Sequence, residues 1–342
     1  MVIDAGAQDP REVHFDYESG GKSIYSLVAS GDGVICGATG IPLRVFRFDP
    51  AVGGIENWGL GGHGGHINQW ARQGGKLYGA VYSCGSLMEY DHTQPFTDAA
   101  LGAGVNPKRV HYAAEARDLY GRPHAVLAHP DGEHLLVGGN PARGLVGGGL
   151  LIYNTVTTEA RILGREELVP DQAVMALTAL PDGDLIVGTA VEAATGGTTT
   201  ATQALVYRIS WATKQVIARW TPIPDAKTVA DLIVGPDGLV YGLARPNHFF
   251  VLSPETGEVL HTEQVTQYGS ITGMQAPRTM ATGPDGGIYV LYRDAIARFE
   301  PGTFAHREVA RPGVPITAGI VIDSGRIYFG SGPNLYSYTL DR

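Results

Sequence analysis

The sequence predicts an all-β fold, a seven-bladed β-propeller that spans residues 1–342 as a single domain. Two observations carry this prediction. An apolar run, a tight turn of the Asp-Gly type and a second apolar run recur seven times, which is the pattern of a β-hairpin. A third apolar run that ends near an aromatic residue follows each hairpin. The rival architecture, a β-sandwich, requires no such seven-fold repeat of hairpins.

The turns of the seven hairpins are about 40 to 57 residues apart, which is the period of propeller blades. The four clearest turns are Asp131-Gly132, Asp182-Gly183, Asp237-Gly238 and Asp285-Gly286. The three weaker turns are Asp32-Gly33, Gly74-Gly75 and Ser324-Gly325. Their uneven spacing indicates loops of different length between similar hairpins.

The remaining strands complete blades of four antiparallel strands. Third strands are expected at RVFRFDP, SLMEYD, LLIYNT, ALVYRIS, FFVLSP, AIARFEP and NLYSYTL, and outer strands at segments such as EARIL, QVIARW and EVLHTE. The seventh repeat ends directly after its third strand. We therefore expect residues 12–17 (EVHFDY) to supply its outer strand, because pairing this open edge would close the ring.

Composition limits the classes of partner. The formal net charge is -9 and no basic stripe is present, which argues against nucleic acid as a partner. A local cluster of Arg and His can still attract an acidic ligand. The chain has no apolar stretch of about 18 residues and no signal-peptide pattern, so we do not expect it to enter a membrane. We expect a monomer. If the protein is a lyase, we expect it to be secreted or periplasmic, with an export signal that was removed. Cys36 and Cys84 lie in apolar runs and are interpreted as buried thiols rather than as a disulfide.

The topology of a propeller predicts where a functional site lies. The Asp-Gly turns gather on one face, so residues before the first strand and after the second strand of each blade meet at the opposite mouth of the channel. Candidates near the start of a first strand are Tyr25, His63, His66, Asn68, Arg122, His124, Gln172 and Arg278. Candidates after a second strand are Tyr82, Asn140, Glu192, Arg245, Asn247 and Arg293.

Several candidates have a plain structural alternative. His63 and His66 stand in the glycine-rich GGHGGH, which lets the backbone approach a ligand but equally describes an exposed turn. Two histidines without a third ligand do not specify zinc, so no cofactor is expected. Arg122 could pair with a surface carboxylate. Tyr78 and Tyr82 share one face of a strand, and Tyr82, nearer the strand end, is the one expected at the mouth.

Two glycine-rich inserts, VGGNPARGLVGGGL and EAATGGTTTATQAL, separate second and third strands on the same face. They are either the walls of a substrate cleft or mobile loops. Neither contains the GxxxxGK[ST] pattern of a phosphate-binding loop.

The repeated PDG hairpins, together with HINQW, GRPHAVLA and GLVGGGLLIYN, resemble a broad group of bacterial seven-bladed propellers. That group includes polysaccharide lyases that act on uronate-containing, often rhamnose-containing polymers, and related glycosidases that use a histidine at the channel mouth. The resemblance covers nearly the whole chain for the fold, but its motifs are only weakly specific for function. It implies an acidic oligosaccharide or polysaccharide as the partner.

The residues at the predicted mouth suit β-elimination, which needs a base, an acid and stabilisation of a developing enediolate. Arg122 or Arg278 would bind the uronate carboxylate, and His66 or His124 would act as base with Tyr82 as acid, or the reverse. The remaining substrate-binding candidates are Tyr25, His63, Asn68, Asn140, Gln172, Glu192 and Arg245.

Three other functions stay open. A glycoside hydrolase would need two carboxyl groups flanking the scissile bond, for which only Glu192 and Asp171 are at hand. A lactonase is a further enzymatic alternative. A propeller that binds a ligand or a protein without turnover would present the same mouth.

Overall fold

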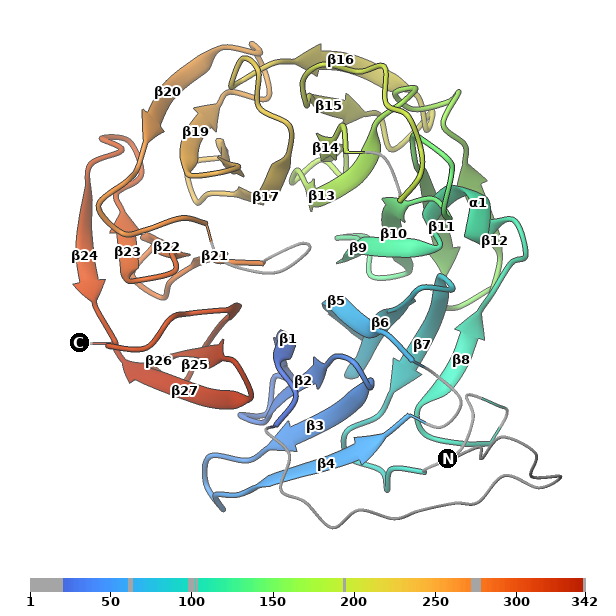
Figure 1. Cartoon of the computed structure of the whole chain (residues 1–342), viewed down its shortest axis with the longest axis vertical. Helices are drawn as coiled ribbons and strands as arrows, with labels where there is room; N and C mark the ends of the chain where they lie inside the picture. Colours follow the sequence, from blue (N-terminus) through green and yellow to red (C-terminus); the bar gives the residue numbers. More distant parts are fainter. Residues whose placement is uncertain are drawn as a thin grey trace, which may run out of the picture.

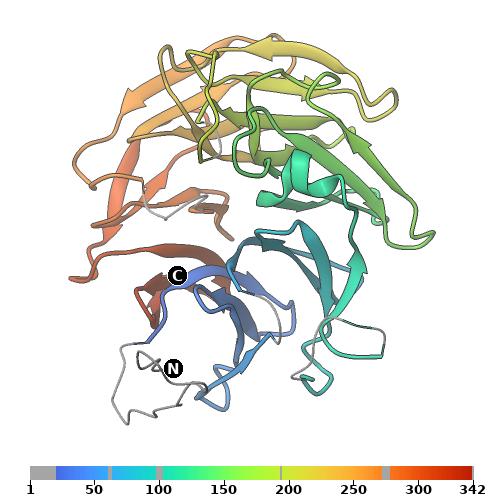
Figure 2. The ribbon, with the colours of Figure 1, turned by 45° about the vertical axis from the view of Figure 1, so that its right-hand side comes forward.

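The structure is a computed structural model that describes residues 21–60, 64–97, 102, 104–192, 195–271 and 278–340. This part of the chain contains 27 strands and one short helix, and the strands form seven antiparallel sheets. The sheets are arranged as blades around a central axis (Figure 1), and the turned view shows the same ring (Figure 2). The predicted all-β, seven-bladed propeller is confirmed.

Each blade is a meander in which consecutive strands pair with each other. The first two blades consist of β1 (Ile24–Ala29), β2 (Ile35–Thr39), β3 (Arg44–Phe48) and β4 (Ile55–Gly59), then β5 (His66–Gln73), β6 (Lys76–Tyr82), β7 (Ser86–Tyr90) and β8 (Lys108–His111). The third and fourth consist of β9 (Arg122–Ala128), β10 (His134–Asn140), β11 (Gly149–Asn154) and β12 (Ala160–Leu163), then β13 (Ala173–Ala179), β14 (Leu185–Ala190), β15 (Val206–Ile209) and β16 (Val216–Trp220).

The fifth and sixth blades consist of β17 (Val229–Val234), β18 (Val240–Ala244), β19 (His248–Leu252) and β20 (Val259–Gln264), then β21 (Met280–Thr282), β22 (Ile288–Leu291), β23 (Ile296–Phe299) and β24 (His306–Ala310). The last blade consists of β25 (Ala318–Asp323), β26 (Arg326–Ser331) and β27 (Asn334–Thr339). The first strand of each blade lies nearest the axis, and the fourth strands lie at the rim (Figure 1).

The seven predicted turns connect the first and second strands of the seven blades. Hydrogen bonds between neighbouring blades show that these turns share one face. Gln73 Nε2, beside the second turn, donates to Gly132 O of the third at 2.8 Å, and His129 Nε2 donates to Gly183 O of the fourth at 2.7 Å. The opposite ends of the first strands therefore form the other mouth of the channel.

The hydrophobic core is divided among the interfaces between blades. Each pair of neighbouring blades encloses its own cluster of buried side chains. The cluster between the last and first blades includes Phe46, Val321 and Tyr328, and it closes the ring by packing. A large apolar side chain that becomes fully buried contributes about 1.5–3 kcal/mol, so each interface is a substantial source of stability.

The sequence indicates the state of the two cysteines but not the short helix. Cys36 and Cys84 are both free thiols, as predicted, but only Cys36 is buried and Cys84 is half-buried. Helix α1 (Ala116–Tyr120) was not expected, because five residues are too few to show a helical period. It buries Ala116 and Tyr120 beside the third blade. No helix within the described residues has the length and apolar character needed to cross a membrane.

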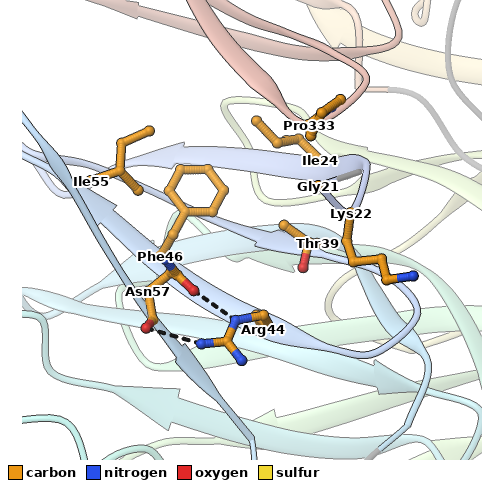
Figure 3. A pocket seen from close by; sticks show the side chains of 9 residues that line it. All are labelled: Gly21, Lys22, Ile24, Thr39, Arg44, Phe46, Ile55, Asn57 and Pro333. Atoms are coloured by element: carbon orange, nitrogen blue, oxygen red, sulfur yellow. Dashed lines mark hydrogen bonds between the residues drawn. The ribbon is translucent and has the colours of Figure 1, made fainter. Parts of the chain in front are cut away.

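The last blade has three strands in the described part of the chain. A pocket of ≈ 330 Å³ lies between this blade and the first one, next to Gly21, the first described residue. Figure 3 shows Arg44 bound to Asn57 on one side of the pocket, with Phe46 and Ile55 beside them and Pro333 opposite. The predicted closing strand, residues 12–17, lies outside the described residues and stays a prediction.

Deletion of residues 1–17 tests this closure. If residues 12–17 pair with the free edge of β27, their removal exposes that edge and lowers Tm by several degrees. Deletion of residues 1–11 is the matched control and should leave Tm unchanged. Equal Tm values for the full chain and the longer deletion, measured by thermal unfolding, would contradict the closure.

Candidate functional site

Three aromatic rings form a stack at the predicted mouth. His66, the first residue of β5, lies between Tyr25 of β1 and Tyr82 of β6. The ring centroids are 4.2 Å apart for Tyr25 and His66, and 4.3 Å apart for His66 and Tyr82. The interplanar angles are 24° and 20°, so both contacts are stacked. His66 is only 1% exposed, whereas the two tyrosines are half-buried.

Two glycines make room for this stack. A Cβ atom on Gly40 would lie 2.6 Å from the His66 Cβ and 2.9 Å from the Tyr25 ring. Gly65 has a φ of 90°, and a Cβ there would lie 1.9 Å from Tyr82 O. A side chain at either position would clash, at Gly40 with the His66 and Tyr25 side chains and at Gly65 with the backbone of Tyr82. Glycine at these two positions therefore lets His66 lie between the rings.

His124, in β9 of the third blade, extends the aromatic group to the next blade. Its ring centroid is 6.4 Å from that of Tyr82 in an edge-on contact, and the side chain is 5% exposed. Burial lowers its pKa to about 3, and the positive charge of Arg278 is the next largest cause, followed by His66, Arg245 and Arg122. The imidazole of His124 is therefore neutral at physiological pH.

Arg278 connects four blades at the centre of the ring. Its Nη2 donates to His124 O at 3.2 Å and to Met175 O at 2.9 Å, and its Nη1 donates to Ala230 O at 3.3 Å and to Asp231 Oδ1 at 3.2 Å. Both Nη groups are thus occupied inside the protein. The role predicted for Arg278, binding the substrate carboxylate, would have to rely on its Nε.

Asp231 is the buried partner of Arg278 and is 2% exposed. Backbone N–H groups of Leu232, Thr279 and Met280 donate to its carboxylate at 2.8 to 3.0 Å. Burial raises the pKa of Asp231 and lowers that of Arg278, and the attraction between the two charges opposes both shifts. A guanidinium keeps its proton and three N–H donors favour the carboxylate, so the pair is ionised. Both residues line a channel cavity of ≈ 360 Å³.

The two glycine-rich inserts lie beside each other next to the mouth. Gly144 N of the first insert donates to Thr195 O of the second at 3.0 Å. Arg122, at the start of β9, donates from Nη1 to Thr195 Oγ1 at 3.2 Å. These contacts hold the two inserts against each other and against Arg122. Their interpretation as cleft walls stays a prediction.

Two further candidates are Arg245 in the fifth blade and Gln172, which directly precedes β13 in the fourth blade. Arg245 follows β18, and burial lowers its pKa while nearby Glu192, which is exposed, opposes the shift. Gln172 is used internally, because its Oε1 accepts from Thr189 Oγ1 at 2.5 Å and its Nε2 donates to Gln203 O at 3.2 Å.

The remaining candidates, Asn140, Arg293 and Asp171, have different surroundings. Asn140 pairs with Arg122 in the ladder between β10 and β9, which places it at the mouth. Arg293 is exposed, and Asp171 accepts a hydrogen bond from Thr200 of the second insert. Tyr78 is packed in the core and donates to Glu89 at 3.0 Å, which leaves Tyr82 as the tyrosine of β6 at the mouth.

Several buried polar atoms at the mouth have no hydrogen-bond partner within the described residues. They all belong to residues at the beginning of a first strand or the end of a second strand: His124 Nε2, Asn140 Oδ1, Thr228 Oγ1, Arg245 Nη2, Arg278 Nε and Thr279 Oγ1. Buried polar groups are nearly always hydrogen-bonded. The group therefore suits a polar ligand, and its arginines favour an acidic one.

Within the described residues, no group of three or more His, Cys, Asp or Glu side chains could hold a metal ion. His63 lies outside the described residues, so its predicted contribution beside His66 stays a prediction.

The main residue of this region that the sequence prediction does not include is Asp231. A detectable signal existed, since Asp231 is the one charged residue in the apolar run VADLIV of β17. Buried charges require partners, so this position indicates a cation nearby. It does not reveal that the partner is Arg278, 47 residues along the chain.

Comparison with known proteins identifies the class of fold. The sequence matches no protein-family model and no curated protein. Among solved structures, an inactive variant of virginiamycin B lyase from Staphylococcus aureus with quinupristin is 12% identical with a TM-score of 0.67, over 96% of this chain and 98% of the other. The WD40 β-propeller domain of Doa1 is 13% identical with a TM-score of 0.63, over 93% of each chain.

A third similar structure is the extracellular domain of a putative hybrid two-component system from B. thetaiotaomicron. It is 13% identical with a TM-score of 0.61, over 94% of this chain and 40% of the other. At such identities the likeness shows the fold alone. The three structures include a lyase, a WD40 domain and an extracellular domain, so the fold does not determine the function.

Replacement of Asp231 tests the central ion pair. Asp231→Asn keeps the shape but leaves the Arg278 guanidinium buried without its counter-charge, and we expect a loss of about 3–5 kcal/mol in the free energy of unfolding. Glu56→Gln is the control, because Glu56 forms an exposed pair with Arg47 worth less than about 1 kcal/mol. Urea unfolding measures both, and similar small losses would contradict the account.

The lowered pKa of His124 predicts a pH dependence of stability. Below about pH 6.5 the unfolded chain binds a proton at His124 that the native protein does not bind. The stabilisation is complete above this pH and is lost as the pH falls toward 3, by at most about 1.4 kcal/mol per pH unit. In His124→Gln, the free energy of unfolding should vary less steeply between about pH 4.5 and 6.5. Identical slopes for the two proteins would contradict the assignment.

Proposed function

We propose that the mouth binds the carboxylate of a uronic acid residue and cleaves an acidic polysaccharide by β-elimination, as a polysaccharide lyase does. One observation carries the proposal: a neutral, buried His124 with an unpartnered Nε2 lies next to Tyr82 and in the field of Arg122, Arg245 and Arg278. The combination joins groups that move protons with groups that bind an anion.

Carboxylate binding would fall to Arg122 and Arg245. Both are half-buried, and Arg245 has an Nη2 without a partner among the described residues. Guanidinium groups bind carboxylates through paired, charge-assisted hydrogen bonds, which are stronger in a site shielded from water. They stabilise the enediolate more than the starting carboxylate, because the enediolate carries one more negative charge.

The reaction needs one proton removed and one supplied. A base takes the proton from the carbon α to the carboxylate, and the electron pair of that C–H bond moves into the enediolate. The pair then forms a carbon–carbon double bond as the C–O bond to the next sugar breaks. The leaving oxygen takes a proton from an acid. His66, His124 and Tyr82 are the proposed proton-transfer groups.

The fold is compatible with a lyase but does not specify the substrate. A lyase occurs among the proteins that share the architecture. The polysaccharide and the uronic acid are inferred from the arginines and from the resemblance of the motifs, and they stay proposals.

A second candidate function is binding without turnover. His66 and His124 are 1% and 5% exposed, and such deep burial suits rings that shape a recognition site as well as it suits rings that exchange protons. The similar structures include the WD40 β-propeller domain of Doa1, whose name does not describe an enzyme. Acidic sugars would then bind at the same mouth and leave unchanged.

A screen with uronate polysaccharides separates the two functions. The lyase proposal predicts an unsaturated product, detected by its ultraviolet absorbance and by mass spectrometry. His66→Ala and His124→Ala should each reduce its formation by at least about 100-fold, the usual contribution of a proton-transfer group. His134→Gln, which lies at the start of β10 next to the Asp-Gly turn on the opposite face, is the control and should keep full activity. Full activity in both alanine variants, or binding without product, would refute the lyase.

A further inference from the structure

The two ring nitrogens of His124 have different surroundings. Its Nδ1 is 3.5 Å from Asn68 Nδ2, while its buried Nε2 has no partner within the described residues. Because the ring is neutral, only one of the two nitrogens carries a proton. Which one does so decides whether His124 offers a ligand a hydrogen-bond donor or a lone pair.

The orientation of the Asn68 amide answers this question. Asn68 is 4% exposed, and its Nδ2 lies 2.8 Å from Pro123 O. A backbone carbonyl can only accept a hydrogen bond, so the amide atom next to it is the amino nitrogen and not the oxygen. That nitrogen has a second hydrogen and no lone pair to offer. A proton on His124 Nδ1 would face this N–H group across 3.5 Å, so the contact favours Nδ1 as the acceptor.

We propose that Asn68 is a positioning residue that holds His124 in the tautomer with its proton on Nε2, so that His124 presents an N–H donor to the ligand. Its acceptor would be an oxygen of the carboxylate or of the enediolate. Arg122 and Arg245 present further donors at the same mouth. Donors of a neutral histidine and of arginines would then converge on one anionic group.

This assignment has a consequence for the reaction. An Nε2 that carries a proton cannot act as the base that attacks the substrate. Proton removal would then fall to His66 or Tyr82, whose stacked rings line the same mouth. The identity of the acceptor rests on the proposed function, whereas the tautomer itself does not.

Nuclear magnetic resonance of protein labelled with ¹⁵N at histidine tests the tautomer without any substrate. Long-range ¹H–¹⁵N correlations distinguish protonated from unprotonated ring nitrogens, and the spectrum of His124→Gln identifies the signals. We expect a protonated Nε2 and an unprotonated Nδ1 from about pH 5 to 9, beyond the range in which an ordinary histidine stays neutral. An unprotonated Nε2, or two protonated nitrogens at pH 5, would overturn the proposal.

Asn68→Asp tests whether Asn68 is the cause. A carboxylate can only accept, so the Nδ1 of His124 should become protonated in this variant. Asn140→Asp is the matched control, because it adds the same charge at the mouth without touching Nδ1, and there Nδ1 should stay unprotonated. An unchanged Nδ1 signal in Asn68→Asp would overturn the role of Asn68. Absence of lyase product would refute the proposed reaction and leave this result standing.

Discussion

The buried guanidinium of Arg278 is the interaction on which the centre of the molecule depends. It holds backbone carbonyls of His124, Met175 and Ala230 in three blades and is neutralised by Asp231. A propeller has no single core, because its apolar clusters lie between blades. Each of these apolar clusters joins two blades, whereas the hydrogen bonds of Arg278 connect four blades at once. The cost of burying it is offset by the Asp231 carboxylate and by the carbonyl acceptors of its two Nη groups.

The same guanidinium links the framework to the candidate site. Its hydrogen bond to the carbonyl of His124 fixes the strand that carries this imidazole, and its charge helps to keep the ring neutral. Asn68 then holds the ring from the neighbouring blade. The mouth thus combines a neutral imidazole, the stacked His66 and Tyr82, and arginine donors with few internal partners. Such an arrangement has little need to reorganise when an anionic group arrives.

The parts of this arrangement that depend on local pattern could be predicted from the sequence. Turns such as Asp182-Gly183 mark hairpins because a tight hairpin turn needs special backbone angles. Tyr78 and Tyr82 share one face of β6, and the position of Tyr82 at the strand end predicts that it, rather than the packed Tyr78, lies at the mouth. The geometry of a propeller then gathers His66 and His124 at one mouth although they are far apart in the chain.

The parts that depend on contacts between blades could not be predicted. Substrate binding by Arg278 and Asn68 stays a prediction. No local pattern indicates that the Nη groups of Arg278 bind carbonyls of residues up to 154 positions away, or that Asn68 contacts Pro123 and His124 across a blade interface. Such pairings follow from the packing of whole blades, for which a single sequence carries no local signal.

A crystal structure with a uronate oligosaccharide bound tests the central claim most directly. The account predicts the carboxylate at the mouth, within hydrogen-bonding distance of Arg122 or Arg245 and of His124 Nε2, with the sugar ring near Tyr82. An oligosaccharide bound at the Asp-Gly face, or one whose carboxylate points away from these arginines, would contradict it.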